Sequence, residues 1–390
     1  MIQTMMEGNQ LVIFLQGQLD SSGAEQTGEE IRNAVSAHPG ISWLVDAEKL
    51  DYISSAGLRV LLGLSKETEK KLIVRNVTSS VYDVFAMTGF TALMDVRRQL
   101  RSLSVDGCPV IGRGAVGTVY RLDEDTIVKV YDIPDCLPMI ENEQKRSKQA
   151  FIRGIPTAIS FDVVRVGDKY GSVFEMVKAD NCNDLIVREP ERRDEIIRIY
   201  VSLLKNVHAV EMMPGELPDA REVYAGYLEE MDGCLPAPVI SRLRKLILDM
   251  PPDLHAVHGD IQMKNVMLSG REPLLIDMET LCTGNPVFEF AGLWMAYCAF
   301  GEDEPGNSMD FLGIDQETAE AVYRQVLSLY TGGEESAAHA GDKIMTAGAL
   351  RFLYVLIALN LGKPELKEIR IRHTVERLEK LLDRVTDLRI

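Results

Sequence analysis

The sequence lacks a long apolar run, because no stretch approaches the roughly 20 apolar residues that a membrane-spanning helix requires. The longest candidate, residues 288–300, is shorter and contains Glu289, so we expect a buried core helix there. The N-terminus also lacks the basic, apolar and small-residue series of a secretory signal. These absences argue against a membrane-spanning or secreted protein and predict a cytoplasmic one.

Positive charge is scarce as well. The chain has 42 Lys and Arg against 59 Asp and Glu, a net charge of −17. Nucleic-acid binding is disfavoured, because neutralising phosphates needs a surplus of Lys and Arg. Residues 1–105 carry a net charge of only −2 and the remainder carries −15. That acidic remainder could attract a cationic ligand, although acidic surfaces usually serve only solubility.

The cysteines form no recognisable cluster. They are scattered, with no CxxC pair and no nearby His, whereas a zinc site or a disulfide scaffold needs tighter spacing. We therefore expect reduced and mostly buried thiols at all six positions, Cys108, Cys136, Cys182, Cys234, Cys282 and Cys298.

A chain of 390 residues is too long for one ordinary core, so several domains are expected. The first hundred residues alternate strands with helices, which predicts a largely parallel sheet covered by helices. The pattern resets between Ser102 and Pro109, after which strands come first and long helices later. We predict an α/β domain followed by a two-lobed α+β domain. The expected boundaries are a first domain over 1–102, a linker over 103–109, a strand-rich N-lobe over 110–177 and a helical C-lobe over 178–390.

The clearest chemical motif is a glycine series at Gly112, Gly114 and Gly117. The apolar run that follows predicts a strand, whereas a dinucleotide-binding turn would open a helix. Glycines in a hairpin let backbone N–H groups approach a polyphosphate closely. Twelve residues beyond Gly117, Lys129 lies on a predicted strand, placed to reach the phosphates. Taken alone, Lys129 would more often be a solvated strand residue.

Three polar residues downstream complete a phosphate-handling set. Asp260 and Asn265 lie five residues apart on one loop, and Asp277 ends an apolar strand twelve residues later. Phosphoryl transfer needs a carboxylate to orient the attacking hydroxyl, oxygen ligands for Mg²⁺ and a cation on the phosphates. We predict that Asp260 orients the hydroxyl, that Asn265 and Asp277 bind Mg²⁺, and that Lys129 binds the phosphates.

Lys129 also needs an ion-pair partner. A helix predicted over residues 139–151 offers Glu143, and Glu141 competes because the two lie only two residues apart. The sequence leaves this choice open.

The series from Gly112 to Asp277 resembles the protein-kinase-like fold. The form His258-Gly259-Asp260, in place of His-Arg-Asp, is similar to the aminoglycoside phosphotransferase and choline kinase branch. The resemblance covers about residues 106–390. It implies ATP as the phosphate donor and Mg²⁺ as the metal.

Two further stretches support that branch. Phe174-Glu175-Met176-Val177 resembles the hinge between the lobes, which implies that the backbone at Glu175 and Val177 binds adenine. Residues 284–291 resemble the family's Gly-Asp-Pro…Asp-Leu-Ala stretch, with Asn285 and Glu289 as departures. We find no Ala-Pro-Glu motif or long activation segment of the kind that typical protein kinases have.

Other positions near the motifs have open or structural roles. Lys264 stands where the family often has Gly and could lie near the transferred phosphoryl group. Glu279 either joins the metal ligands or is a solvated loop carboxylate, which is the commoner case. His258 and His208 are expected to be structural residues that brace the catalytic loop.

The N-terminal domain carries its own motif at residues 50–58, between a predicted strand and a predicted helix. The segment resembles the STAS domain of anti-sigma-factor antagonists, and residues 17–20 and 84–90 fit as well. The resemblance implies that a kinase phosphorylates Ser55 and so switches binding to an anti-sigma-factor or STAS partner. Ser54 stands where the family often has Asp, and a Ser here could also cap the helix.

Together these features predict an ATP-dependent phosphotransferase that is coupled to a STAS domain and acts on a hydroxyl of a small molecule. A cationic small molecule is one option for this acceptor. One alternative is a protein Ser/Thr kinase acting on a STAS serine. Another is a non-catalytic nucleotide-sensing scaffold, but the presence of the full set of motif residues argues against it. The missing activation segment favours a small molecule as the phosphate acceptor, whereas the fusion to a STAS domain favours a protein acceptor. Acidic insertions at 211–232 and 302–317 are candidate walls of the acceptor site.

Overall fold

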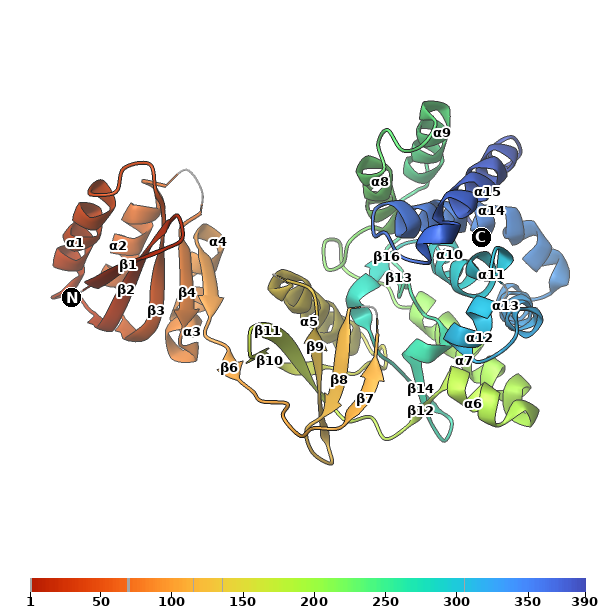
Figure 1. The fold of residues 1–390 in the computed structure, drawn as a ribbon, viewed down its shortest axis with the longest axis horizontal. Coiled ribbons are helices and arrows are strands. Elements are labelled where there is room, and N and C mark those ends of the chain that lie inside the picture. The colour runs from red at the N-terminus through yellow and green to blue at the C-terminus, as the bar shows by residue number, and fades with distance from the viewer. Residues whose placement is uncertain (1, 69–70, 115, 135, 305) are drawn as a thin grey trace. The chain divides into compact units, whose positions relative to one another are not determined.

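The computed structural model describes residues 2–68, 71–114, 116–134, 136–304 and 306–390. The chain divides into two compact units, Met1–Ser104 and Val105–Ile390 (Figure 1). Within the described ranges, every helix is too short or too polar to cross a lipid bilayer.

The first unit is an α/β domain built on one mixed sheet with the strand order β1-β2-β3-β4-β5. The first pair of strands is antiparallel and the other neighbouring pairs are parallel, which confirms the predicted fold class. Its elements are β1 (Ile2–Glu7), β2 (Gln10–Leu19), α1 (Ala24–Ser36), β3 (Ser42–Ile53), α2 (Ser55–Ser65), β4 (Ile73–Val77), α3 (Ser79–Met87), α4 (Phe90–Leu93), β5 (Asp95–Arg98) and β6 (Arg101–Ser102).

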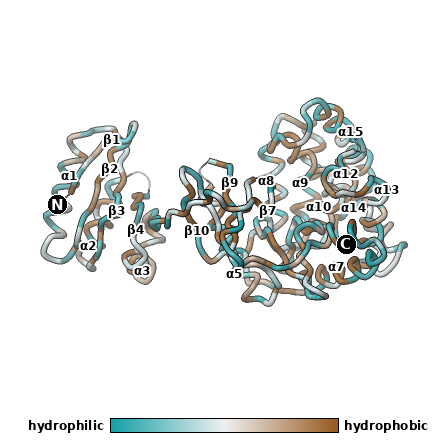
Figure 2. Tube along the Cα trace, turned by 60° about the horizontal axis from the view of Figure 1, so that its bottom comes forward, coloured by the Kyte–Doolittle hydropathy of each residue, from teal (hydrophilic) through white to brown (hydrophobic). Residues whose placement is uncertain are grey.

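The hydrophobic run Leu11 to Leu15 explains why β2 lies inside this sheet (Figure 2). Strands whose two faces are both covered are apolar at consecutive positions, and Leu11, Val12 and Ile13 of β2 are all buried. By contrast, β1 is an edge strand whose residues beyond Ile2 are exposed. The buried side chains of β2 and β3 pack with those of the helices into a single core.

The second unit opens with an antiparallel sheet in which β10, β11, β9, β8 and β7 are neighbours in that order. Helix α5 packs on this sheet with Ile140, Glu143, Ser147 and Ala150 on its buried face, at helical spacing. The elements of this N-lobe are β7 (Val110–Arg113), β8 (Gly117–Arg121), β9 (Thr126–Tyr131), α5 (Leu137–Ile152), β10 (Ser160–Val166) and β11 (Lys169–Glu175).

The rest of the second unit is a helical C-lobe with short strands between its helices. Together with the strand-rich N-lobe it forms the two-lobed α+β domain that the sequence predicted. Its elements are β12 (Asp180–Asn181), α6 (Cys182–Arg188), η1 (Pro190–Arg192), α7 (Arg193–His208), α8 (Ala220–Glu230), α9 (Ala237–Leu248), β13 (Ala256–Val257), η2 (Met263–Asn265), β14 (Val266–Ser269), β15 (Glu272–Leu275), η3 (Met278–Thr280), β16 (Cys282–Thr283), α10 (Val287–Trp294), η4 (Met295–Ala299), α11 (Phe300–Glu302), α12 (Gly306–Leu312), α13 (Gln316–Thr331), α14 (Glu334–Ile357) and α15 (Pro364–Leu382).

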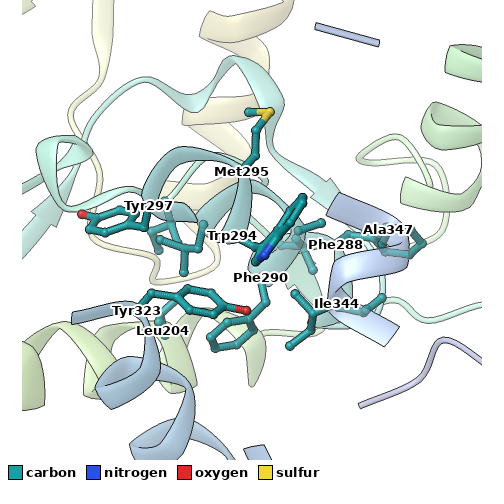
Figure 3. Packing of buried hydrophobic residues seen from close by; sticks show 14 of the residues in the cluster. Leu204, Phe288, Phe290, Trp294, Met295, Tyr297, Tyr323, Ile344 and Ala347 are labelled. Atoms are coloured by element: carbon teal, nitrogen blue, oxygen red, sulfur yellow. The ribbon is translucent and has the colours of Figure 1, made fainter. Parts of the chain in front are cut away.

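The centre of the C-lobe is the apolar stretch that runs through α10, the π-helical turn η4 and α11. Every residue of α10 is buried, and α10 packs along α14. Aromatic and aliphatic side chains meet in this core, and Figure 3 shows Phe288, Phe290, Trp294 and Tyr297 in one cluster with Ile344 and Ala347 of α14. The packing fixes α10 and α14 beneath the loops that carry the polar motif residues.

Candidate active site

The glycine series forms the hairpin between β7 and β8. The Gly114 N–H donates a hydrogen bond to the Gly117 carbonyl at 2.9 Å. A Cβ at Gly117 would lie 2.2 Å from the Val130 carbonyl oxygen, so the neighbouring strand leaves no room for a side chain. A Cβ at Gly112 or Gly114 would meet protein atoms only at 3.7 Å or more. Packing therefore explains Gly117 and does not explain the other two glycines.

Lys129 projects from β9 into a group of carboxylates. Its Nζ lies 3.1 Å from Asp277 Oδ1 and 3.8 Å from Glu143 Oε2. Burial lowers the pKa of Lys129, but the negative charges of Asp277 and Glu143 outweigh burial and raise that pKa above its ordinary value. Lys129 is therefore a fixed positive charge at the junction of the two lobes.

Of the two candidate glutamates, Glu143 is the one whose carboxylate faces Lys129. Glu143 lies on the buried face of α5, whereas Glu141 is exposed. The Tyr131 hydroxyl donates to Glu143 Oε2 at 2.9 Å. Burial raises the pKa of Glu143, and the positive charge of Lys129 opposes that rise.

Asp260 lies on the loop between β13 and η2, beside Asn265. The Asn265 Nδ2 donates to the Asp260 carbonyl at 2.8 Å and lies 3.3 Å from Asp260 Oδ2. The Gln262 Nε2 donates to the same Oδ2 at 3.2 Å. Two side-chain amides thus hold one oxygen of the carboxylate.

A residue that sequence reasoning missed, Arg351 of α14, holds the same loop from below. Its Nη1 donates to the Gly259 carbonyl, and its Nη2 lies 3.6 Å from Asp260 Oδ1. The only pattern signal at Arg351 was a charged residue inside an apolar helical stretch.

Glu289, noted as a departure from the family pattern, braces the catalytic loop. Its buried carboxylate accepts hydrogen bonds from the backbone N–H groups of His258 at 2.7 Å, Gly259 at 2.9 Å and Ile261 at 3.3 Å. Burial raises the pKa of Glu289, but the hydrogen bond and charge of His208 outweigh burial and lower that pKa below its ordinary value. Glu289 is thus a buried anion that organises backbone donors.

The two histidines lie in buried polar contacts. His208 Nδ1 lies 2.8 Å from the Tyr330 hydroxyl, and His208 Nε2 lies 3.3 Å from Glu289. His258 is fully buried, and its Nε2 lies 3.2 Å from the Ile276 carbonyl oxygen. Both histidines contact the loop or its brace through side-chain atoms that face the protein interior.

Asp277 follows β15 in the left-handed backbone region, with φ +64°. The preceding residue ties this segment to the catalytic loop, because the Ile276 N–H donates to the Asn265 carbonyl at 3.0 Å. Oxygens of Asn265 and Asp277 suit Mg²⁺, which prefers oxygen ligands and retains water and phosphate oxygens. The described residues contain no group of three His, Cys, Asp or Glu around one point, so such an ion would need those additional ligands.

The predicted hinge lies where β11 leaves the N-lobe sheet. Glu175 is paired with Thr126 of β9, and the Met176 N–H donates to the Asp125 carbonyl at 2.7 Å. The Ala179 N–H donates to the Val177 carbonyl at 3.0 Å. The backbone at Glu175 and Val177 is thereby anchored beside the strand that carries Lys129.

The structure gives definite contacts to the residues whose roles were open. Lys264 Nζ lies 4.6 Å from the ring centroid of Phe311 in α12, a cation–π contact. Glu279 is half-buried, and burial together with the charge of Asp277 raises its pKa. Its backbone carbonyl accepts a hydrogen bond from Arg146 of α5. Glu279 is therefore less solvated than an ordinary loop carboxylate.

Ser55 lies in the first unit, at the first position of α2. Ser54 is the N-cap residue: its Oγ accepts from the Gly57 N–H at 3.3 Å and lies 3.2 Å from the Leu19 carbonyl. A Cβ at Gly57 would lie 2.6 Å from that carbonyl, so the helix start is packed tightly on the end of β2. Ser55 is exposed and has no hydrogen-bond partner among the described side chains. The capping role therefore belongs to Ser54, and Ser55 is left available.

Two family models match the chain. The model of the phosphotransferase enzyme family matches residues 107–324, which is more than half of the sequence. The chain belongs to the phosphotransferase enzyme family. A second model, described as Mlab, STAS domain, matches residues 2–97, so this phosphotransferase carries an N-terminal STAS domain.

One curated relative and two solved structures illustrate what the two parts of the chain are similar to. BtrV of Bordetella bronchiseptica, named as an anti-sigma factor antagonist, is 37% identical over 90 residues, which span 22% of this phosphotransferase and 76% of BtrV. An ADP-bound aminoglycoside phosphotransferase, APH(2'')-Ib, is 14% identical and covers 77% of this chain and 98% of its own, with a TM-score of 0.47. A thermostable mutant of APH(4)-Ia in its apo form is 13% identical and covers 71% and 94%, with a TM-score of 0.47.

Proposed function

We propose that this phosphotransferase moves the γ-phosphoryl group of ATP to a hydroxyl of a small molecule and that its STAS domain regulates the reaction. The observation that carries the proposal is the 3.1 Å contact between Lys129 Nζ and Asp277 Oδ1, beside the pair formed by Asp260 and Asn265. Phosphoryl transfer depends mostly on positioning and on charge stabilisation, and these residues offer both.

In this proposal each side chain has a separate task. Asp260 orients the acceptor hydroxyl and takes its proton, while the hydroxyl oxygen bonds to phosphorus and the bond from phosphorus to the ADP oxygen breaks. Lys129, held by Glu143, binds the phosphates. Asn265 and Asp277 would hold Mg²⁺, which when bound neutralises charge on the phosphates.

The nucleotide would lie between the glycine hairpin and the hinge. Gly112 and Gly114 have no packing requirement, which supports a role in letting backbone N–H groups approach the phosphates. The backbone at Glu175, which ends the strand next to β9, and at Val177 just beyond that strand would bind adenine.

The acceptor site would lie on the side of Asp260 that faces α8 and α14. Tyr227 of α8 and Tyr354 of α14 stack with their ring centroids 3.9 Å apart. The Tyr354 hydroxyl donates to Glu230 at 3.3 Å. Aromatic faces beside a carboxylate attract cations, and the charge of −15 in this part of the chain acts in the same direction. These features support a cationic acceptor.

Nucleotide binding and turnover can be tested directly. ATP with Mg²⁺ should raise the Tm, because a ligand that binds only the native state stabilises it by mass action. ADP release should then be measured over a panel of amines, sugars and STAS proteins, and an amine should give the largest increase. Absence of a Tm shift at millimolar ATP·Mg²⁺ would overturn the proposal.

A second candidate function is phosphorylation of a STAS serine, in the same or another chain. The exposed and unengaged hydroxyl of Ser55 supports it. Incubation with ATP·Mg²⁺ should then add one phosphate at Ser55, and Asp260→Asn should prevent the addition. Intact-mass and peptide mass spectrometry would decide. Either function belongs in the cytoplasm, where ATP and an anti-sigma-factor or STAS partner would meet the enzyme.

A further inference from the structure

The catalytic loop carries no arginine of its own next to Asp260. Gly259 stands at the position where protein kinases with His-Arg-Asp have Arg. The fold brings a guanidinium to the same place from another element, because Arg351 of α14 lies beneath the loop. Its Nη1 donates to the carbonyl of Gly259 itself, and its Nη2 lies 3.6 Å from Asp260 Oδ1.

The surroundings of Arg351 are shaped to hold it there. Its side chain is only 10% exposed. A Cβ at Gly292 of α10 would lie 2.9 Å from Arg351 Nη1 and 2.9 Å from the Gly259 carbonyl oxygen. Only a glycine at this position of α10 lets the guanidinium and the loop carbonyl meet. A buried cation is costly unless it is paired and hydrogen-bonded, so its contacts with the loop matter.

Arg351 is the one ion-pair partner of Asp260 within the described ranges. The charge of Asp260 also raises the pKa of Tyr200 in α7, Tyr227 in α8, Glu279 in η3 and Tyr297 in η4. Burial raises the pKa of each tyrosine, so all three stay neutral near pH 7. Glu279 can add only negative charge. The compensating positive charge at Asp260 therefore comes from Arg351.

We infer that Arg351 is a positioning residue that holds the Asp260 carboxylate in the orientation that faces the acceptor hydroxyl. Arg351 holds Oδ1, while Gln262 and Asn265 hold Oδ2, so the carboxylate plane is fixed from both sides. The inference rests on the proposed function, in which Asp260 takes the proton of the acceptor hydroxyl. It adds that the side chain that positions Asp260 comes from α14.

The first test is the rate of ADP release from ATP·Mg²⁺ at neutral pH, with water as the acceptor, for wild type, Arg351→Met and Arg351→Lys. Arg351→Met loses both contacts with the loop, so its rate should fall on the order of 10- to 100-fold. Arg351→Lys, which keeps the charge and loses the planar fork, should recover part of the rate.

A double-mutant cycle with Asp260→Asn separates positioning from a general structural role. If Arg351 acts through Asp260, Arg351→Met should lower ADP release strongly in the wild-type background and little in the Asp260→Asn background. An equal loss in both backgrounds would overturn the inference. The Tm shift with ATP·Mg²⁺ should survive in every variant. Its absence in the wild type would instead count against the proposed function.

The stability of the four proteins in the double-mutant cycle can be measured by urea unfolding, which needs no acceptor. The two tryptophans lie in different units, so Trp294 alone reports the second unit in a Trp43→Phe background. The urea midpoint should fall less for Arg351→Met when Asp260 is already Asn. Equal shifts in both backgrounds would contradict the ion pair. If Arg351→Met does not fold, Arg351→Lys decides, because an equal loss of ADP release in the wild-type and Asp260→Asn backgrounds would refute the inference.

Discussion

His208 Nε2 lies 3.3 Å from Glu289 Oε2, and both side chains are buried beneath the loop that carries Asp260. The same carboxylate also receives three backbone N–H groups of that loop, from His258, Gly259 and Ile261. A carboxylate that accepts several charge-assisted hydrogen bonds fixes the path of the backbone more firmly than apolar packing could. The geometry of the catalytic loop therefore depends on a helix, α10, that contains no residue of the proposed reaction.

The first prediction concerns this brace. Glu289→Gln keeps the shape of the side chain but removes a buried charge, so it should lower the free energy of unfolding by about 3–5 kcal/mol. ADP release should fall, because the loop loses its fixed path. Urea unfolding followed by Trp294 fluorescence measures the stability, and the exposed Glu368→Gln on α15 is the matched control.

The difference in stability between wild type and Glu289→Gln should also depend on pH. The folded-state pKa of Glu289 lies below its ordinary value of 4.5, so its stabilisation is complete above that value. The stabilisation is lost as the pH falls through the lower, folded-state pKa. The gap in stability between wild type and Glu289→Gln should therefore be constant near neutral pH and narrow in acid below pH 4.5. A gap that stays constant into acid would show that the charge of Glu289 is not what stabilises the fold.

A second prediction tests the nucleotide site. Lys129→Ala should abolish most of the Tm shift produced by ATP·Mg²⁺, because it removes the cation that would bind the phosphates. Lys169→Ala is the control, since Lys169 lies in the same sheet but pairs with Asp132 at the surface. Similar losses in both variants would mean that the effect is unspecific charge removal.

A third prediction separates two aspartates. Asp260→Asn should leave ATP binding nearly unchanged and lower transfer on the order of 10²–10⁴-fold, the usual contribution of a positioned acid or base. Asp277→Asn should instead weaken the Mg²⁺-dependent part of nucleotide binding. Isothermal titration with ATP, with and without Mg²⁺, distinguishes the two. If both variants lose ATP binding equally, this division of roles is wrong.

A fourth prediction uses the glycine hairpin. Gly117→Ala places a Cβ against the Val130 carbonyl and should lower the stability of the second unit by about 1–3 kcal/mol. Gly114→Ala meets no such obstacle and should leave stability nearly unchanged, yet weaken ATP binding by hindering the approach of the phosphates. The urea midpoint should therefore fall mainly in Gly117→Ala. The ATP affinity measured by titration should fall in Gly114→Ala while its urea midpoint stays nearly unchanged.

A fifth prediction concerns the STAS domain. Ser54→Ala removes the N-cap of α2 and should cost about 1 kcal/mol of stability. Ser55→Ala should leave the stability nearly unchanged but abolish any phosphate incorporation in the first unit. Thermal unfolding with mass spectrometry compares the two. Phosphate retained in Ser55→Ala would place the modification on another residue.

Much of the site follows from the sequence because its parts are short motifs in fixed order. Spacing alone pointed to Lys129, Asp260, Asn265 and Asp277, and the fold brings their loops together at the lobe junction. Glu143 could have been preferred over Glu141, since Ile140, Ser147 and Ala150 mark the buried face of the same helix.

Other parts could not be predicted. Arg351 lies 92 residues from Gly259, and nothing in its local pattern says which loop it supports. Glu289 was recognisable as a departure, but its four donors come from two distant segments that only the tertiary fold assembles. Whether Ser54 or Ser55 caps α2 depends on the residue at which the helix begins, and sequence patterns rarely define a helix boundary to one residue.

The distance along the chain between Gly259 and Arg351 also has a consequence for biosynthesis. A ribosome that has just added Gly259 must add 92 further residues before Arg351 exists, which takes roughly 5–20 s at ordinary elongation rates. The STAS domain has by then long been synthesised and can fold as a unit. During that interval the nascent chain holds a finished STAS domain and an Asp260 loop without Arg351. The chain should therefore complete its STAS domain before it acquires the power to transfer phosphate.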